Sequence, residues 1–190
     1  MKQKTNCFNE LIREVKALKE YHNPLPLIED LHVNSIDGDY QFTTSILTLQ
    51  FVSRTIENTL KIHKRKSSLY VGFQTLSHFK EYADRYKKLA NYAKEIFIVG
   101  MGDTKIEHIA DNVHIVTKHA YRVKDNWFAI IKGGGMHISL IAEELPVPGA
   151  HKYDGFYSNS NDITEKAVEI IKNNKILANE LEYGEQETLF

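Results

Sequence analysis

The chain has 190 residues, 42% of them hydrophobic, and its 24 lysines and arginines nearly balance 25 aspartates and glutamates, giving a net charge of −1. This length fits one domain spanning residues 1–190, with enough apolar residues to bury a substantial core. Nucleic-acid-binding proteins usually carry a basic excess, so the balanced charge argues against a nucleic-acid partner. Cys7 is the single cysteine, which excludes a disulfide within the chain and favours a cytoplasmic protein. No apolar run approaches the roughly 20 residues that cross a bilayer, so we expect no membrane association.

The first predicted element is an amphipathic helix over residues 6–21. Apolar residues spaced three and four apart share one side of it: Phe8, Leu11, Ile12, Val15 and Leu18. The helix should end before Pro24, because the residue preceding a proline avoids the helical region. If the chain is a scaffold or dimerisation module, a homodimer would form through Phe8, Leu11, Val15 and Leu18.

A second helix is predicted from about Thr44 to His63, with an apolar stripe wide enough for burial against a sheet. Arg54 and Glu57 lie three residues apart on its side, where the two side chains can pair. One interpretation is a surface ion pair of small energy. The other is a polar pair that lines a cleft.

The next segment, Leu69–Asp103, has the pattern of a strand, a helix and a second strand. The strands are the short apolar runs Leu69–Val71 and Ile96–Val99. The helix between them carries an apolar stripe on one face, formed by Phe79, Tyr82, Ala83, Tyr86, Ala90 and Ala93. Such a unit predicts a βαβ crossover whose two strands are parallel in one sheet.

Two further β runs, Asn126–Ile131 and Met136–Ala142, are joined by glycines at positions 133–135. A phosphate loop would need a helix directly after the glycines, and none is predicted there. The segment therefore predicts a β-hairpin. Together with the βαβ unit it indicates an α/β fold, a mixed β-sheet flanked by helices.

Residues 149–161 combine aromatic side chains with glycine, serine and asparagine, which suggests an aromatic loop that acts as a lid. Its aromatic residues are Tyr153, Phe156 and Tyr157. A last helix is predicted over about residues 163–178, after a sequence at Asp162–Glu165 that resembles a capping box. The polar, acidic tail 179–190 is expected to be mobile.

Ligands of parallel sheets usually bind at the carboxyl ends of the strands, where this sequence places two candidate groups. Phe73 and Gln74 follow the first strand, and a buried amide there must either hold a loop or meet a ligand. Gly100, Gly102 and Asp103 follow the second strand, where backbone N–H groups of the turn can face an anion. The full dinucleotide fingerprint is absent, because Lys105 stands at the third glycine position. The glycines are therefore either a site or only a turn.

The sequence contains no recognisable catalytic constellation. Its nine histidines form no HExxH pair, and no GxSxG elbow is present, so we expect neither a metal site nor catalytic residues. An alternative hypothesis is a small enzyme acting on a nucleotide or phosphorylated metabolite, with Asp103 and either His78 or His108 as acid and base.

Several of these runs together resemble the DICT domain, a sensory domain of prokaryotic diguanylate cyclases and two-component systems. The similarity covers about residues 40–145 and is carried by the segments Ser45–Glu57, Leu69–Gln74, Arg85–Ala90, Ile96–Gly100 with Gly102 and Asp103, Asn126–Ile131 and Ile141–Glu144. The resemblance implies a non-catalytic input module for signal transduction, linked to light or redox responses when coupled to an output domain. It implies no catalytic residues and names no cofactor.

We therefore interpret the chain as a sensory domain that binds a small molecule or a signalling protein and relays this event to an output module. The candidate ligand-binding residues are Phe73, Gln74, Gly100, Gly102, Asp103, Arg54 and Glu57. No cyclase, kinase or DNA-binding output domain fits within the 190 residues. We accordingly expect the chain either to act through partner proteins or to be part of a longer protein.

Overall fold

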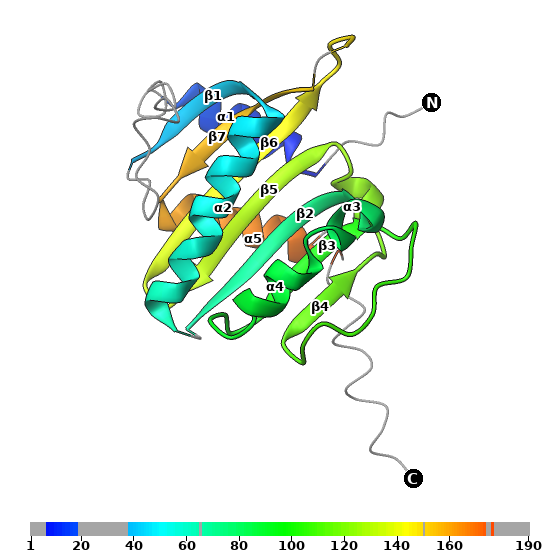
Figure 1. Cartoon of the computed structure of the whole chain (residues 1–190). Helices are drawn as coiled ribbons and strands as arrows, with labels where there is room; N and C mark the ends of the chain where they lie inside the picture. The colour runs from blue at the N-terminus through cyan, green and yellow to red at the C-terminus, as the bar shows by residue number, and fades with distance from the viewer. Residues whose placement is uncertain (1–6, 19–37, 65, 150, 174–175, 177–190) are drawn as a thin grey trace.

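The computed structural model describes residues 7–18, 38–64, 66–149, 151–173 and 176. Its centre is a seven-stranded mixed sheet with the strand order β1-β7-β6-β5-β2-β3-β4 (Figure 1). The strands are β1 (Tyr40–Ser45), β2 (Ser67–Thr75), β3 (Ile96–Met101), β4 (Val113–Val116), β5 (Asn126–Gly133), β6 (Met136–Leu145) and β7 (Lys152–Ser158). The predicted α/β class is confirmed.

The predicted βαβ unit is also confirmed. β2 and β3 are parallel, with Leu69 opposite Ile96, and β4 continues the parallel part of the sheet on the other side of β3. The connection is two short helices, α3 (Leu76–Lys80) and α4 (Ala83–Leu89), and not the single helix predicted. The helix breaks because the Tyr82 N–H bonds to the Phe79 carbonyl three residues back, at 2.8 Å, which makes a tight turn.

The predicted hairpin joins β5 to β6. Gly133 pairs with Met136, which leaves Gly134 and Gly135 as a two-residue turn with φ values of +60° and +82°. Positive φ at both central positions is typical of the type I′ turn, whose twist matches the flanking strands. No phosphate loop is formed at these glycines.

The segment predicted as an aromatic loop is a strand, β7, and this expectation was wrong. β7 lies inside the sheet between β1 and β6, with Tyr153, Phe156 and Tyr157 at most 2% exposed. Gly155 allows the close pairing with β6, because a Cβ at this position would lie 2.1 Å from the Ile141 carbonyl oxygen. The three aromatic side chains are therefore core residues and do not form a lid.

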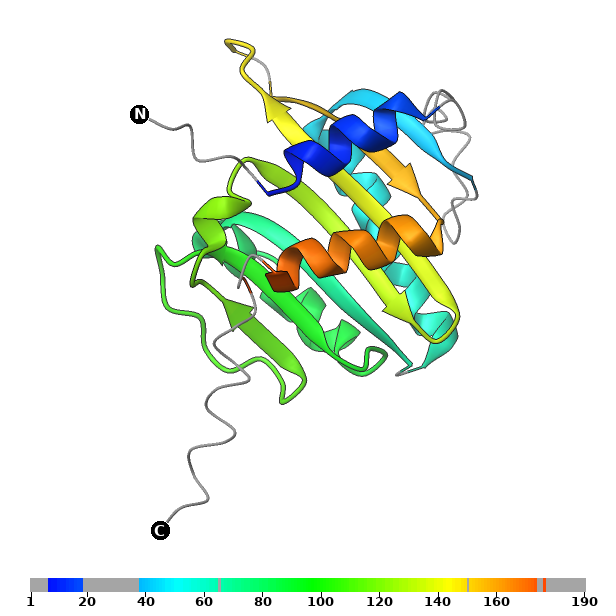
Figure 2. The same ribbon diagram turned by 180° about the vertical axis from the view of Figure 1, so that it is seen from behind.

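Helices cover both faces of the sheet. On one face lie α2 (Ile46–His63), α3 and α4, packed on a core that includes Leu49, Ile56 and Tyr86 (Figure 1). On the other face lie α1 (Asn9–Ala17) and α5 (Asn161–Asn173), packed on Phe128, Ile130, Ile141 and Phe156 (Figure 2). The molecule is therefore a three-layer α/β/α arrangement, with a short 3₁₀ helix, η3 (Ala120–Arg122), before β5.

The two terminal helices agree with the sequence only in their central parts. α1 is amphipathic as predicted, but Phe8, Leu11 and Val15 are at most 1% exposed because the chain's own sheet covers them. Three of the four residues predicted for a homodimer interface are thus covered within the chain, whereas the fourth, Leu18, is 37% exposed. α5 begins at Asn161, slightly earlier than predicted. The predicted ends at residues 19–21 and 177–178 and the tail 179–190 lie outside the described residues.

Candidate ligand-binding site

A pocket opens on the face of the sheet that carries α2 and α4. Its empty volume, counted into the open solvent at its mouth, is about 420 Å³. The lining residues come from two helical segments and two strands. α2 supplies Gln50, Ser53, Arg54 and Glu57, and the α3–α4 segment supplies His78, Tyr82, Arg85 and Tyr86. β2 supplies Val71, Gly72 and Phe73, and β5 supplies Trp127, Phe128 and Ala129. Three of the predicted site residues, Arg54, Glu57 and Phe73, thus share one pocket.

Glu57 is the buried charge of this pocket, and only 2% of it is exposed. The Arg85 guanidinium donates to its Oε2, and the Tyr86 hydroxyl donates to its Oε1 at 2.7 Å. Burial raises the pKa of Tyr86, so this hydroxyl stays a donor. Burial also lowers the pKa of Arg85, and the nearby Arg54 cation lowers it further. Glu57 therefore pairs with Arg85 of α4, and not with Arg54 as the spacing predicted.

Arg54 is exposed at the pocket and makes no ion pair with any residue that the structure describes. The pocket thus has two guanidinium groups against one carboxylate. A guanidinium presents several N–H donors in a plane that matches a carboxylate or phosphate. This arrangement favours an anion at the pocket.

Aromatic rings form the other walls. The Phe73 ring meets those of His78 and Tyr82 at centroid distances of 5.9 and 6.0 Å. Trp127 is half-buried, and its indole N–H donates to Ser53 Oγ at 2.8 Å, which fixes the ring against α2. Trp127 therefore lines the pocket as a fixed aromatic wall. Fixed rings of this kind suit a planar ligand.

A second hollow adjoins the first and shares Gly72, Phe73, His78 and Trp127 with it. Its further lining residues are Ile46, Gln74, Asn126 and Tyr153. Gln74 is exposed, and not buried as predicted, since it follows the part of β2 covered by helices. Its amide donates to Glu144 Oε2 at 2.7 Å and thereby ties β2 to the end of β6. Gln74 was considered either as a residue that holds the structure or as one that meets a ligand, and this hydrogen bond corresponds to the first role.

The glycine turn after β3 does not line either hollow. Asp103 is exposed, and its carboxylate accepts hydrogen bonds from the Ser77 N–H at 2.9 Å and from the Ser77 hydroxyl at 2.5 Å. Both bonds lower the pKa of Asp103, and the bond from the Ser77 hydroxyl has the larger effect. A Cβ at Gly100 would lie 3.1 Å from Leu76 Cδ2, and one at Gly102 would lie 3.3 Å from Thr117 Cγ2. The turn thus anchors the start of α3, and ligand binding by its residues stays a prediction.

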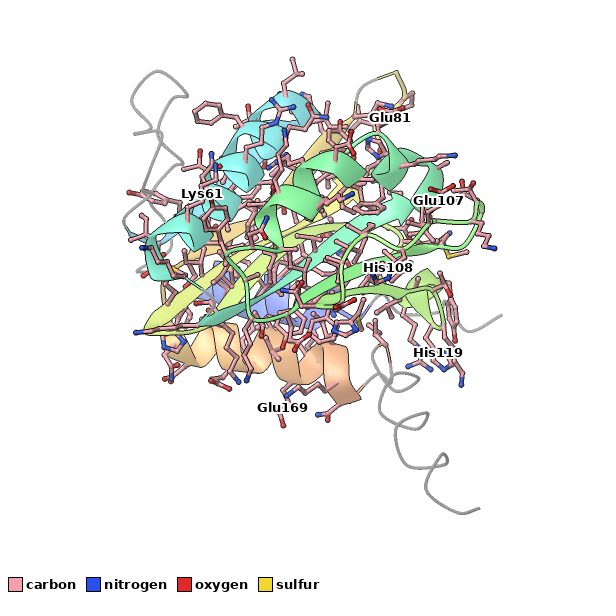
Figure 3. The ribbon with its side chains drawn as sticks, turned by 60° about the horizontal axis from the view of Figure 1, so that its bottom comes forward. Lys61, Glu81, Glu107, His108, His119 and Glu169 are labelled. Atoms are coloured by element: carbon pink, nitrogen blue, oxygen red, sulfur yellow. The ribbon has the colours of Figure 1, made fainter. Side chains whose placement is uncertain are left out.

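The histidines of the enzyme hypothesis do not join Asp103. His78 lies in the pocket beside Phe73, whereas His108 lies on the loop after β3 and pairs with Asp111 at 3.3 Å (Figure 3). No hydrogen bond connects Asp103 to either histidine in the described part of the chain. Among the same residues, no three histidine, cysteine, aspartate or glutamate side chains are grouped as metal ligands. The geometry gives the enzyme hypothesis no acid–base pair.

Most residues that line the two hollows were not among the predicted site residues, and three of these carry polar groups that shape the site. Arg85 and Tyr86 come from α4, and Asn126 begins β5. In the sequence Tyr86 belongs to an ordinary apolar stripe, and Arg85 is one of many charged residues on a helix. Glu57 lies on a helix that the sequence predicts to be buried, and a buried carboxylate needs a cation and a hydrogen-bond donor as partners. This requirement could have drawn attention to Arg85 and Tyr86.

These features define an α/β domain with an open pocket on one face of its sheet. The chain belongs to the DICT family: residues 27–145 match the family described as a sensory domain in diguanylate cyclases and two-component systems. A search of curated proteins and a search of solved structures each gave no match. The family is a sensory and non-catalytic one, in agreement with the resemblance seen in the sequence. Within the described residues, no helix has the length and apolar character needed to traverse a bilayer.

Proposed function

We propose that this domain is a non-catalytic sensor that binds a small ligand in the pocket between α2 and α4 and passes the binding event to a signalling partner or output module. The observation that supports this most directly is the arrangement of charge. A buried carboxylate, Glu57, is held by Arg85 and Tyr86 beneath aromatic walls, while the exposed Arg54 has no ion pair among the described residues.

The pair formed by Glu57 and Arg85 also suggests how binding is relayed. It joins α2 to α4, and both helices lie on the same face of the sheet (Figure 1). An anion that binds Arg54 and Arg85 competes with Glu57 for the Arg85 donors. The position of α4 relative to α2 then depends on whether the ligand is bound, and a partner on this face detects the change.

The experiment is a ligand screen by thermal shift and native mass spectrometry, using signalling nucleotides, flavins and tetrapyrroles. We expect at least one compound to raise the melting temperature of the wild type and to lose this effect in Arg54→Gln and Phe73→Ala. Lys61→Gln is the matched control, because Lys61 lies on the same helix, outside the pocket, and is exposed (Figure 3). A stabilising ligand that binds both pocket variants as well as the control would contradict the proposed site. An empty screen, together with pull-downs that recover no partner, would remove the support for the function.

A further inference from the structure

Asn126 is a buried polar residue whose hydrogen-bonding capacity is only half used. It begins β5, is 3% exposed and lines the second hollow beside Trp127. Its Nδ2 donates to the Ala142 carbonyl at 3.3 Å, whereas its Oδ1 has no hydrogen-bond partner among the described residues. The amide orientation is fixed by this bond, since the opposite orientation would place two oxygens against each other.

A buried carbonyl without a donor is uncommon, because it has lost its hydrogen bonds to water and gained none in return. The neighbouring donors do not supply one. The Trp127 N–H donates to Ser53 and the Gln74 amide to Glu144, and neither His78 nor Tyr153, which line the same hollow, bonds to Asn126 Oδ1. Asn126 Oδ1 is itself covered from solvent, so only a donor inserted into the hollow that Asn126 lines could pair with it.

The two hollows share Gly72, Phe73, His78 and Trp127 in their linings, so they adjoin each other. Arg54 lines the first hollow, and Asn126 lines the second. The rings of Phe73 and Trp127 line both hollows. Together the two adjoining hollows are lined by a cation, two aromatic rings and a hydrogen-bond acceptor without a donor.

We infer that the ligand of this pocket is a small planar anion that also carries an N–H or O–H donor. Its anionic group faces Arg54, its ring packs against Phe73 and Trp127, and its donor bonds to Asn126 Oδ1. This inference rests on the proposed function, since it names the ligand class of the same pocket. It makes Asn126 the residue that selects among anionic rings.

The test uses three probes, benzoate, 4-hydroxybenzoate and 4-methoxybenzoate, whose dissociation constants are measured by NMR titration. Only the second carries a donor opposite its carboxylate. We expect the wild type to bind 4-hydroxybenzoate about tenfold more tightly than 4-methoxybenzoate, the usual effect of one hydrogen bond to a buried acceptor. Asn126→Leu should abolish this preference while still binding benzoate. Arg54→Gln should weaken all three probes, and Lys61→Gln should change none.

The outcomes separate this inference from the function on which it rests. If all three probes bind the wild type equally and Arg54→Gln weakens them equally, the pocket binds anions and the role of Asn126 is overturned. If none of the probes binds, the ligand class is overturned, whereas the sensory function is judged by the screen of nucleotides, flavins and tetrapyrroles. The preference of the wild type needs no variant, so the test remains decisive if Asn126→Leu does not fold.

Discussion

Glu57 shows how a single residue can determine both the stability and the charge of a pocket. A carboxylate that is 2% exposed has lost nearly all of its hydration, which is costly unless cations and donors replace the water. Arg85 and Tyr86 provide this replacement, one to each carboxylate oxygen. Removing Glu57 would therefore leave a guanidinium and a hydroxyl without their partner.

We predict that Glu57→Ala destabilises the protein by about 3 kcal/mol, the lower end for a broken buried ion pair because Arg85 is partly exposed. Chemical denaturation of the wild type and the variant measures this difference. Glu169→Ala is the control, since Glu169 lies exposed on α5 and points away from the sheet (Figure 3). The double variant Glu57→Ala/Arg85→Ala should be less destabilised than the sum of the two single variants. Equal stability of Glu57→Ala and Glu169→Ala would show that the buried pair contributes nothing.

Cys7 gives a prediction about pH. Burial raises the pKa of its thiol from 9.0 to about 11. Because the thiolate is the reactive form, alkylation by iodoacetamide at pH 8 should be roughly 100-fold slower in the folded protein than in denaturant. The rate should keep rising with pH up to about 11. A half-maximal rate near pH 9 in the folded protein would show that the thiol is not shielded.

The same shift affects stability, with a definite sign. A thiol whose pKa is raised on folding favours the folded state while it is protonated, so its contribution is complete below pH 9 and is lost as the pH rises to about 11. Cys7→Ala should therefore lose less stability over this interval than the wild type does.

At the scale of elements, the sequence predicted best where local chemistry decides the structure. The apolar runs of β2 and β3 and the glycines of the β5–β6 hairpin define their elements without distant partners. β7 was missed because its aromatic residues stand among glycine, serine and asparagine, which resemble a loop. Its strand conformation depends on pairing with β1 and β6 on both sides, including the contact that Gly155 allows.

The pocket also depends on residues that are far apart in the sequence, which limits its prediction. Arg54, Glu57 and Phe73, three of the seven predicted site residues, line the same pocket. The partners of Glu57 come from α4, 28 and 29 positions away, and are brought close only when both helices pack on the sheet. The unfilled oxygen of Asn126 likewise becomes visible only once β5 lies beside β6 and supplies the Ala142 carbonyl.

The hairpin turn offers a matched pair of substitutions. Both Gly134 and Gly135 have positive φ, a conformation that an alanine adopts at a cost of roughly 1–2 kcal/mol. Only Gly134 is also confined, because its Cβ would lie 2.6 Å from the Lys66 Cβ, whereas nothing lies within 4 Å of a Cβ at Gly135. We therefore predict that Gly134→Ala lowers the free energy of unfolding by about 1 kcal/mol more than Gly135→Ala. Thermal and denaturant unfolding of both variants measure the difference. Equal losses would mean that backbone strain alone acts at this turn.

At the scale of the whole molecule, the two faces of the sheet differ in what their helices cover. α2 and α4 cover one face and α1 and α5 the other (Figures 1 and 2). The pocket lies on the first face, and an apolar cluster packs beneath the helices of the second. α1 contributes Phe8, Leu11, Ile12 and Val15 to this cluster, each at most 1% exposed. A helix so deeply packed on its own sheet serves the stability of the domain and not its association.

This assignment leads to a prediction that distinguishes a structural helix from a dimerisation helix. Leu11→Ala should lower the free energy of unfolding by about 2–4 kcal/mol, because it removes apolar contacts and leaves a cavity beneath α1. Arg13→Ala, an exposed substitution on the same helix, should change the free energy of unfolding by less than about 0.5 kcal/mol. Light scattering coupled to size exclusion should give the same molar mass for the wild type and both variants. If Leu11→Ala instead halved the molar mass at unchanged stability, α1 would be an interface between two chains, and the face of the sheet beneath α1 would have to be covered in another way.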